Sequence, residues 1–153
     1  MPVFSIKYQD ILALIEAFDP VAYAKSRNYS DGAVSRLSPY ISRGVISTRL
    51  VYERLLKRGI KFYQMEKFVQ ELAWRDFWQR QWQHHGVGIN QDLKHPQEHV
   101  RFYGLPRAIQ EADTGIDVID KAIEELYQTG YMHNRLRMYL ASIVCNVGQY
   151  HWR

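Results

Sequence analysis

The chain has 153 residues, of which 46% are hydrophobic and 14% aromatic, and its formal net charge is +4 at pH 7. This length supports one core and is too short for two ordinary domains, so we expect a single domain over 1–153. A single cysteine excludes a disulfide framework, and no apolar run approaches the length of a membrane span, so we expect a cytoplasmic protein without membrane contact.

Helical spacing of apolar residues recurs along the chain and strand-like alternation is nearly absent, which predicts an all-α fold. We expect the first helix at 10–18, capped by Asp10, and the next to begin at Pro20. Ser47 should cap a helix that stops at Gly59. Further helices are expected at about 64–85, 105–112 and 116–129, and a last one over 130–152.

The last helix has an unusually polar start. His133, Asn134, Arg135 and Arg137 precede an apolar stripe formed by Leu136, Leu140, Ile143, Val144 and Val147. Helical geometry places Arg137 inside that stripe. Two interpretations fit the segment: a core arginine that is satisfied by a carboxylate, or polar groups that meet a ligand.

The long helix expected at about 64–85 carries charged residues on a face that is otherwise aromatic. In "FVQELAWRDFW", Glu71 and Arg75 interrupt a face that also holds Phe68, Trp78 and Trp82, and Trp74 flanks it. A plain ion pair between Glu71 and Arg75, four residues apart, is one interpretation. A pocket for a flat group is the other, because indole stacks on a ring while a carboxylate meets its polar edge.

The stretch "SRLSPY" predicts either an ordinary helix cap or an anion site. Ser38 as the cap, followed by Pro39, would leave backbone N–H groups at the positive end of a helix, and Ser35 and Arg36 would add a hydroxyl and a charge.

A zinc site at "HPQEH" is rejected. Two histidine ligands on one helix would require the helix to begin at His95, because Pro96 follows it directly, and the surrounding residues are typical of a loop. We therefore expect no metal.

Five segments, taken in order, resemble the FAD-binding helical domain of the DNA photolyase and cryptochrome family. They are "YAKSR", "DGAVSRLSPYISRGVIS", "FVQELAWRDFW", "TGIDVIDKAIEELYQTGYMHNRLRMYLAS" and "YHWR". The resemblance implies light-driven electron donation from reduced FAD to a cyclobutane pyrimidine dimer in damaged DNA, which is the reaction of a deoxyribodipyrimidine photo-lyase. Flipping a base out of the duplex is part of that chemistry.

The resemblance also implies roles for individual residues. Glu71, Trp74 and Asn134 would contact the lesion, with Arg135 and Met138 beside them, and Trp152 would match the middle tryptophan of an electron-transfer chain. Asn134 replaces a histidine of the (6-4) branch, which favours cyclobutane dimers. The residues implied for FAD are Tyr23, Val34, Ser35, Arg36, Leu37, Ser38, Phe68, Arg75 and Arg137.

The sequence departs from the family pattern at several points. Val34 stands where threonine is usual, Phe68 stands where tryptophan is common, and the stretch 83–151 contains no tryptophan, so the usual distal member of the electron-transfer chain is missing. We expect a C-terminally incomplete domain with no N-terminal α/β antenna domain and without the final flavin-contacting segment. Such a chain should bind FAD weakly or not at all, should not repair DNA by itself, and should favour self-association through its uncovered last helix.

Two other functions remain open at this stage. One is a cryptochrome-type blue-light photoreceptor domain, in which the same pocket signals to a partner. The other is a basic, flavin-free helical module that binds nucleic acid.

Overall fold

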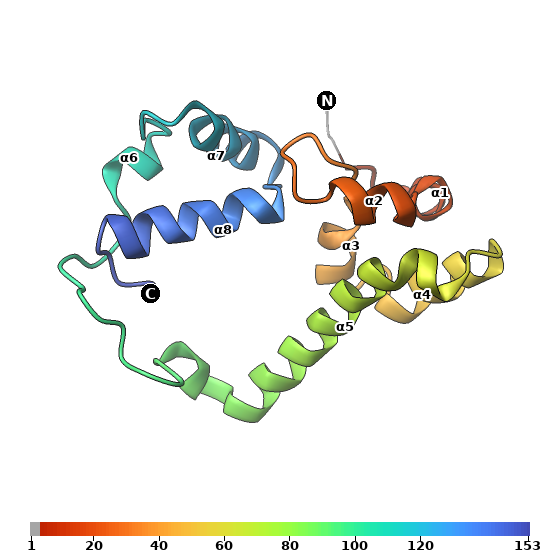
Figure 1. Cartoon of the computed structure of the whole chain (residues 1–153), viewed down its shortest axis with the longest axis horizontal. Coiled ribbons are helices and arrows are strands. Elements are labelled where there is room, and N and C mark those ends of the chain that lie inside the picture. The colour runs from red at the N-terminus through yellow and green to blue at the C-terminus, as the bar shows by residue number, and fades with distance from the viewer. Residues whose placement is uncertain (1–3) are drawn as a thin grey trace. The chain divides into compact units, whose positions relative to one another are not determined.

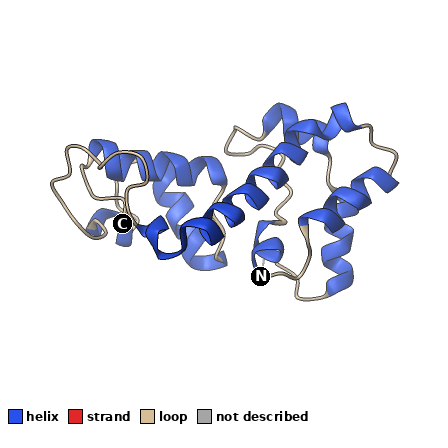
Figure 2. Ribbon diagram, turned by 90° about the horizontal axis from the view of Figure 1, so that it is seen from below, coloured by secondary structure: helices blue, strands red, loops and turns tan. Residues whose placement is uncertain are grey.

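The computed structural model describes residues 4–153, and the described residues divide into two compact units at His84 and His85. Helices and loops make up both units, and the described residues contain one isolated bridge, between Phe102 and Tyr150 (Figure 2). The predicted all-α class is confirmed. None of the helices in residues 4–153 combines the length and apolar character that a membrane span requires.

The first unit contains five helices, in red to green in Figure 1. Asp19 caps the second helix by accepting hydrogen bonds from the backbone N–H groups of Val21 and Ala22, and Ser47 caps the fourth as expected. The helices are α1 (Tyr8–Ala17), α2 (Pro20–Ser26), α3 (Ser38–Ser42), α4 (Thr48–Lys57) and α5 (Phe62–His85).

The core of the first unit forms where α1 packs on α4 and where α5 adds its N-terminal half. Ile15, Val51, Leu55 and Met65 are fully buried there. Asp10 does not cap α1, because the helix begins two residues earlier and the Asp10 carboxylate instead accepts a hydrogen bond from the Ser5 hydroxyl.

The second unit has its own core. Buried side chains of α7 and α8 form it together with Ile109 and Met132, so the described residues hold two cores where the length predicted one. The elements are η1 (Gly86–Asn90), α6 (Arg107–Gln110), α7 (Asp117–Thr129), α8 (Asn134–Ser142) and η2 (Ile143–Val147). Gly130 ends α7 in the left-handed conformation, as expected for a glycine at this position.

The last helix is shorter than predicted. It begins at Asn134, widens into a π-helical turn at η2 and ends before Gly148. The chain then turns away because Gln149 accepts hydrogen bonds from the backbone of Arg101 and Phe102, and the His151 N–H donates to the carbonyl of Phe102 at 2.8 Å. Trp152 is therefore not on the helix, and Val147 is 77% exposed rather than part of the apolar stripe.

The contribution of the Asp19 cap to the stability of α2 can be measured directly. Asp19→Ala removes both side-chain hydrogen bonds to the first turn, so we expect the free energy of unfolding to fall by about 1 kcal/mol in urea denaturation. Asp31→Ala, in the exposed loop that follows α2, is the matched control and should have a smaller effect. Equal losses in the two variants would contradict the capping role of Asp19.

Candidate functional site

An ion pair fixes the carboxylate of Glu71. Arg27, just after α2, donates from Nη1 to Glu71 Oε1 on α5, across 44 residues of sequence. The side chains are 28% and 38% exposed. The sequence suggested Arg75 as the partner of Glu71, but Arg75 instead points to α3, where it donates to Ser42 Oγ at 3.4 Å and to the carbonyl of Ile41 at 3.5 Å.

Aromatic rings support this ion pair. The Tyr23 ring lies 5.7 Å from the Arg27 guanidinium and packs edge-on against Phe68, which also contacts Phe18. Cations are attracted to the face of such rings, so Tyr23 helps to hold Arg27 against α5.

The pKa shifts of the network reflect burial and pairing. Burial raises the pKa of Tyr23, an effect that the hydrogen bond from Arg27 partly offsets. Burial works against the charged form of Arg27, but the hydrogen bonds and charges of Glu71 and Tyr23 together outweigh it and raise the pKa of Arg27.

Trp74 follows Glu71 by three residues on α5 and is 54% exposed. Its indole contacts the rings of Phe77 and Trp78, at centroid distances of 5.6 and 6.3 Å. An exposed indole next to a fixed carboxylate offers a stacking surface and a hydrogen-bond acceptor on the same helix.

The loop before α3 is built differently from the predicted cap. Leu37 occupies the cap position, Ser38 is the first helical residue, and the Ser35 hydroxyl accepts a hydrogen bond from the backbone N–H of Leu37 at 3.3 Å. The reason is that Leu37 is completely buried in the first core, which draws the loop inward. Arg36 takes a left-handed conformation, with φ of 52°, and its side chain is exposed.

Two other predicted residues take part in packing. Phe68 is only 4% exposed and packs between Phe18 and Tyr23. It can therefore support a ligand site by packing in the core but cannot contact the ligand itself. Val34 is half-buried in the loop before Ser35.

The start of α8 carries the predicted residues of the second unit. His133 caps the helix, with its Nδ1 accepting from the N–H of Arg135 at 3.1 Å. Arg137 is exposed and donates to Asn134 Oδ1 at 3.2 Å, so it does not lie in the core stripe. The Asn134 amide group lies 3.9 Å from the sulfur of Met138, which is also exposed.

Trp152 is held by a residue that the sequence did not single out. Its indole Nε1 donates to Asp92 Oδ1 at 2.5 Å, and its backbone N–H donates to Gln97 Oε1 at 2.9 Å. Arg27 and Asp92 were both missed because their partners lie 44 and 60 residues away, where helical periodicity gives no signal.

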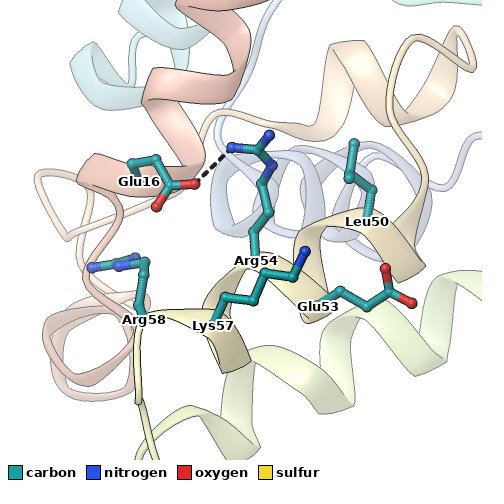
Figure 3. A pocket seen from close by; sticks show the side chains of 6 residues that line it. All are labelled: Glu16, Leu50, Glu53, Arg54, Lys57 and Arg58. Carbon is teal, nitrogen blue, oxygen red and sulfur yellow. Dashed lines mark hydrogen bonds and ion pairs between the residues drawn. The ribbon is translucent and has the colours of Figure 1, made fainter.

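A cavity of about 300 Å³ between α1 and α4 lies in the first unit (Figure 3). Arg54 bridges to Glu16 at 2.8 Å across it, and Arg58 donates to the carbonyls of Ile15 and Phe18 at the end of α1. These cations are already used to join the two helices, and the cavity contains none of the predicted site residues.

Comparison with known proteins identifies the family. Residues 68–153, more than half of the chain, match the family described as the FAD binding domain of DNA photolyase. The chain belongs to the photolyase and cryptochrome family. FAD is accordingly the cofactor of this domain.

Individual relatives place the domain within longer proteins. A deoxyribodipyrimidine photo-lyase of Thermus thermophilus is 38% identical over 82% of the chain. Two solved structures, a class III photolyase from Agrobacterium tumefaciens and a cryptochrome from Synechocystis, are each 24% identical and share the fold, with TM-scores of 0.85 and 0.82 over 98% and 99% of the chain. The chain spans 30% of the length of the Thermus relative, and 33% and 34% of the two solved chains.

The donor groups of the first unit fit the phosphates of FAD. Ser38 is exposed, and its hydroxyl makes no hydrogen bond to another described residue. The hydrogen bonds of Arg75 are long, so its guanidinium keeps donor capacity for an anion. Hydroxyls and guanidinium groups are the partners that phosphate oxygens take in proteins.

The ion pair of Glu71 can be tested by its contribution to stability. Arg27→Met keeps the aliphatic stem but leaves Glu71 without its partner, so we expect the free energy of unfolding to fall by about 1 kcal/mol. Arg49→Met removes the pair with Glu53 on α4, in which Arg49 is 85% exposed, and should change the stability less. A larger loss in Arg49→Met would contradict a structural role for the Arg27 pair.

Proposed function

We propose that this chain is the flavin- and lesion-binding domain of a photolyase that repairs cyclobutane pyrimidine dimers. The observation that carries the proposal is the position of Glu71, which Arg27 holds one turn from the exposed indole of Trp74. When bound, reduced FAD supplies the light-excited electron. The side chains of the domain provide binding and orientation.

Glu71 and Trp74 have complementary roles toward a flipped-out base. A carboxylate accepts hydrogen bonds and does not donate them, so Glu71 suits the N–H on the edge of a thymine ring. Trp74 offers a face on which the same ring stacks. Because Arg27 orients Glu71, it acts as a positioning residue in this proposal.

Asn134, at the start of α8 in the second unit, offers an amide donor. Arg137 donates to its Oδ1, and among the residues that the structure describes its Nδ2 meets only the sulfur of Met138, which is a weak acceptor. The amide can therefore donate to a carbonyl oxygen of a thymine. A neutral amide is a poor proton donor, whereas rearrangement of a (6-4) adduct requires proton transfer. Cyclobutane dimers are therefore the proposed substrate.

FAD would be held by Ser35, Arg36, Ser38 and Arg75, all of which belong to the first unit. Tyr23, Leu37 and Phe68 would support this surface from the core, and Val34 would contribute backbone. Arg137 and Arg135 add positive charge at the start of α8, which favours a polyanionic ligand such as DNA or the flavin phosphates.

Repair can be measured on oligonucleotides that carry one defined lesion. In a protein of the relatives' full length that contains this domain, with FAD supplied and reduced, we expect blue light to restore thymines from a cyclobutane dimer and to leave a (6-4) adduct unchanged. A dark sample is the control. Flavin binding without any light-dependent repair would overturn the proposal in favour of a photoreceptor of the cryptochrome type, and repair of the (6-4) adduct alone would overturn the choice of lesion.

Substitutions should affect lesion binding and FAD binding separately. Glu71→Ala and Trp74→Ala should weaken binding to the dimer oligonucleotide, with about 1–3 kcal/mol lost for the stacked ring, and leave the FAD affinity nearly unchanged. Arg36→Ala should lower the FAD affinity first, as measured by flavin fluorescence titration. Trp82→Ala, an exposed tryptophan on the same helix, and Arg49→Ala are the matched controls. Loss of FAD binding in Glu71→Ala and Trp74→Ala, with unchanged DNA affinity, would contradict these assignments.

A further inference from the structure

The second half of α5 carries its aromatic side chains on the surface of the first unit. The last buried residue of this helix is Leu72. Beyond it, the rings of Trp74, Phe77 and Trp78 are 54%, 43% and 55% exposed. Core packing therefore does not hold the indole of Trp74, and any fixed orientation of this ring must come from other contacts.

The indole of Trp74 contacts two other rings of α5. Trp78, one turn later, stacks on it nearly parallel, at a centroid distance of 6.3 Å and an angle of 23°. Phe77 meets both indoles edge-on, at 5.6 Å and 85° to Trp74 and at 5.3 Å and 73° to Trp78. Residues three and four positions apart lie side by side on a helix. Each of the three rings thus contacts the other two, in arrangements that aromatic pairs favour.

These contacts constrain a side chain that would otherwise move. Exposed side chains change rotamer within picoseconds to nanoseconds, and stopping this motion when a ligand binds costs conformational entropy. A ring that is already held in one orientation avoids this cost. Glu71, one turn before Trp74, is already held by its ion pair with Arg27, and the ring contacts give the indole a corresponding constraint.

We propose that Trp78 is a positioning residue for Trp74, with Phe77 as its support. Trp78 stacks on one face of the Trp74 indole, which leaves the other face for a flipped-out thymine. In this role Trp78 acts through Trp74 and does not itself contact the lesion. The inference rests on the proposed function, because the lesion-binding role of Trp74 is part of that proposal. All three rings belong to the first unit, so their contacts do not depend on the second unit.

The alternative is that the three rings contact one another only because they are neighbours on the helix. In that case the orientation of Trp74 would not depend on the ring at position 78. The two cases therefore differ in how the Trp74 indole moves once that ring is removed.

The motion of Trp74 can be measured without flavin or DNA, so this test can fail independently of the proposed function. In the full chain, Trp82 and Trp152 are replaced by phenylalanine, and Trp78 by either phenylalanine or leucine, which leaves Trp74 as the sole tryptophan. Time-resolved fluorescence anisotropy then follows its indole. Trp78→Phe keeps a ring beside Trp74, so we expect a decay dominated by tumbling of the protein. Trp78→Leu should add a fast local component, and an identical decay in the two variants would overturn the positioning role.

The affinity for the lesion tests the consequence for binding. In a protein of the relatives' full length that contains this domain, we expect Trp78→Leu to raise the Kd for a dimer oligonucleotide in the dark by about two- to tenfold, which is the typical worth of an aromatic pair. Trp78→Phe should keep most of the affinity, and the Kd for the undamaged oligonucleotide should not change. Trp82→Leu is the matched control, because Trp82 is 58% exposed on the same helix, and it should have little effect.

A double-mutant cycle separates positioning from direct contact with the lesion. If Trp78 acts through Trp74, Trp78→Leu should cause no further loss of affinity once Trp74→Ala is present. An equal loss from Trp78→Leu in both backgrounds, or an unchanged Kd in Trp78→Leu where Trp74→Ala weakens binding, would overturn the positioning role. An unchanged Kd in Trp74→Ala would instead contradict the proposed function itself.

Discussion

The orientation of Glu71 in the first unit depends on its ion pair with Arg27. The guanidinium and the carboxylate are both partly buried, and their ion pair compensates for the hydration that each group loses. The pair connects the end of α2 to the middle of α5, and the rings of Phe18, Tyr23 and Phe68 fill the space beside it. The proposed lesion-binding carboxylate thus has a defined orientation because of a residue that is itself outside the helix.

The loop before α3 follows from burial in the same core. Leu37 is fully buried, which places Ser38 at the first helical position and leaves Arg36 on the surface with a left-handed backbone. Hydrophobic burial therefore presents the polar residues on either side of Leu37 outward, where phosphate groups can meet them. The outward position of the donors in the proposed flavin site thus follows from the burial of Leu37.

The second unit depends on a different constraint, which is the backbone pairing of its last residues with 101–102. Because the widened turn at η2 ends the helix, the last residues leave the helical path. The rings of Tyr150 and His151 then contact those of Phe102 and Tyr103, and Trp152 stacks on His151. Trp152 is fixed by two hydrogen bonds that it donates, from its indole Nε1 to Asp92 and from its backbone N–H to the side chain of Gln97. A helix continued to Trp152 would have separated these rings.

The sequence alone determined the helical class, the cap at Ser47, the glycine that ends α7, and the family with its FAD cofactor. These features come from local chemistry and from motifs that are contiguous along the chain. Only the tertiary structure decided that Glu71 pairs with Arg27 rather than Arg75, that Arg137 lies outside the core beside Asn134, and that Trp152 meets Asp92. The physical reason is that a periodic pattern identifies which face of a helix is apolar, whereas the partner of a polar side chain is set by packing between segments far apart in sequence.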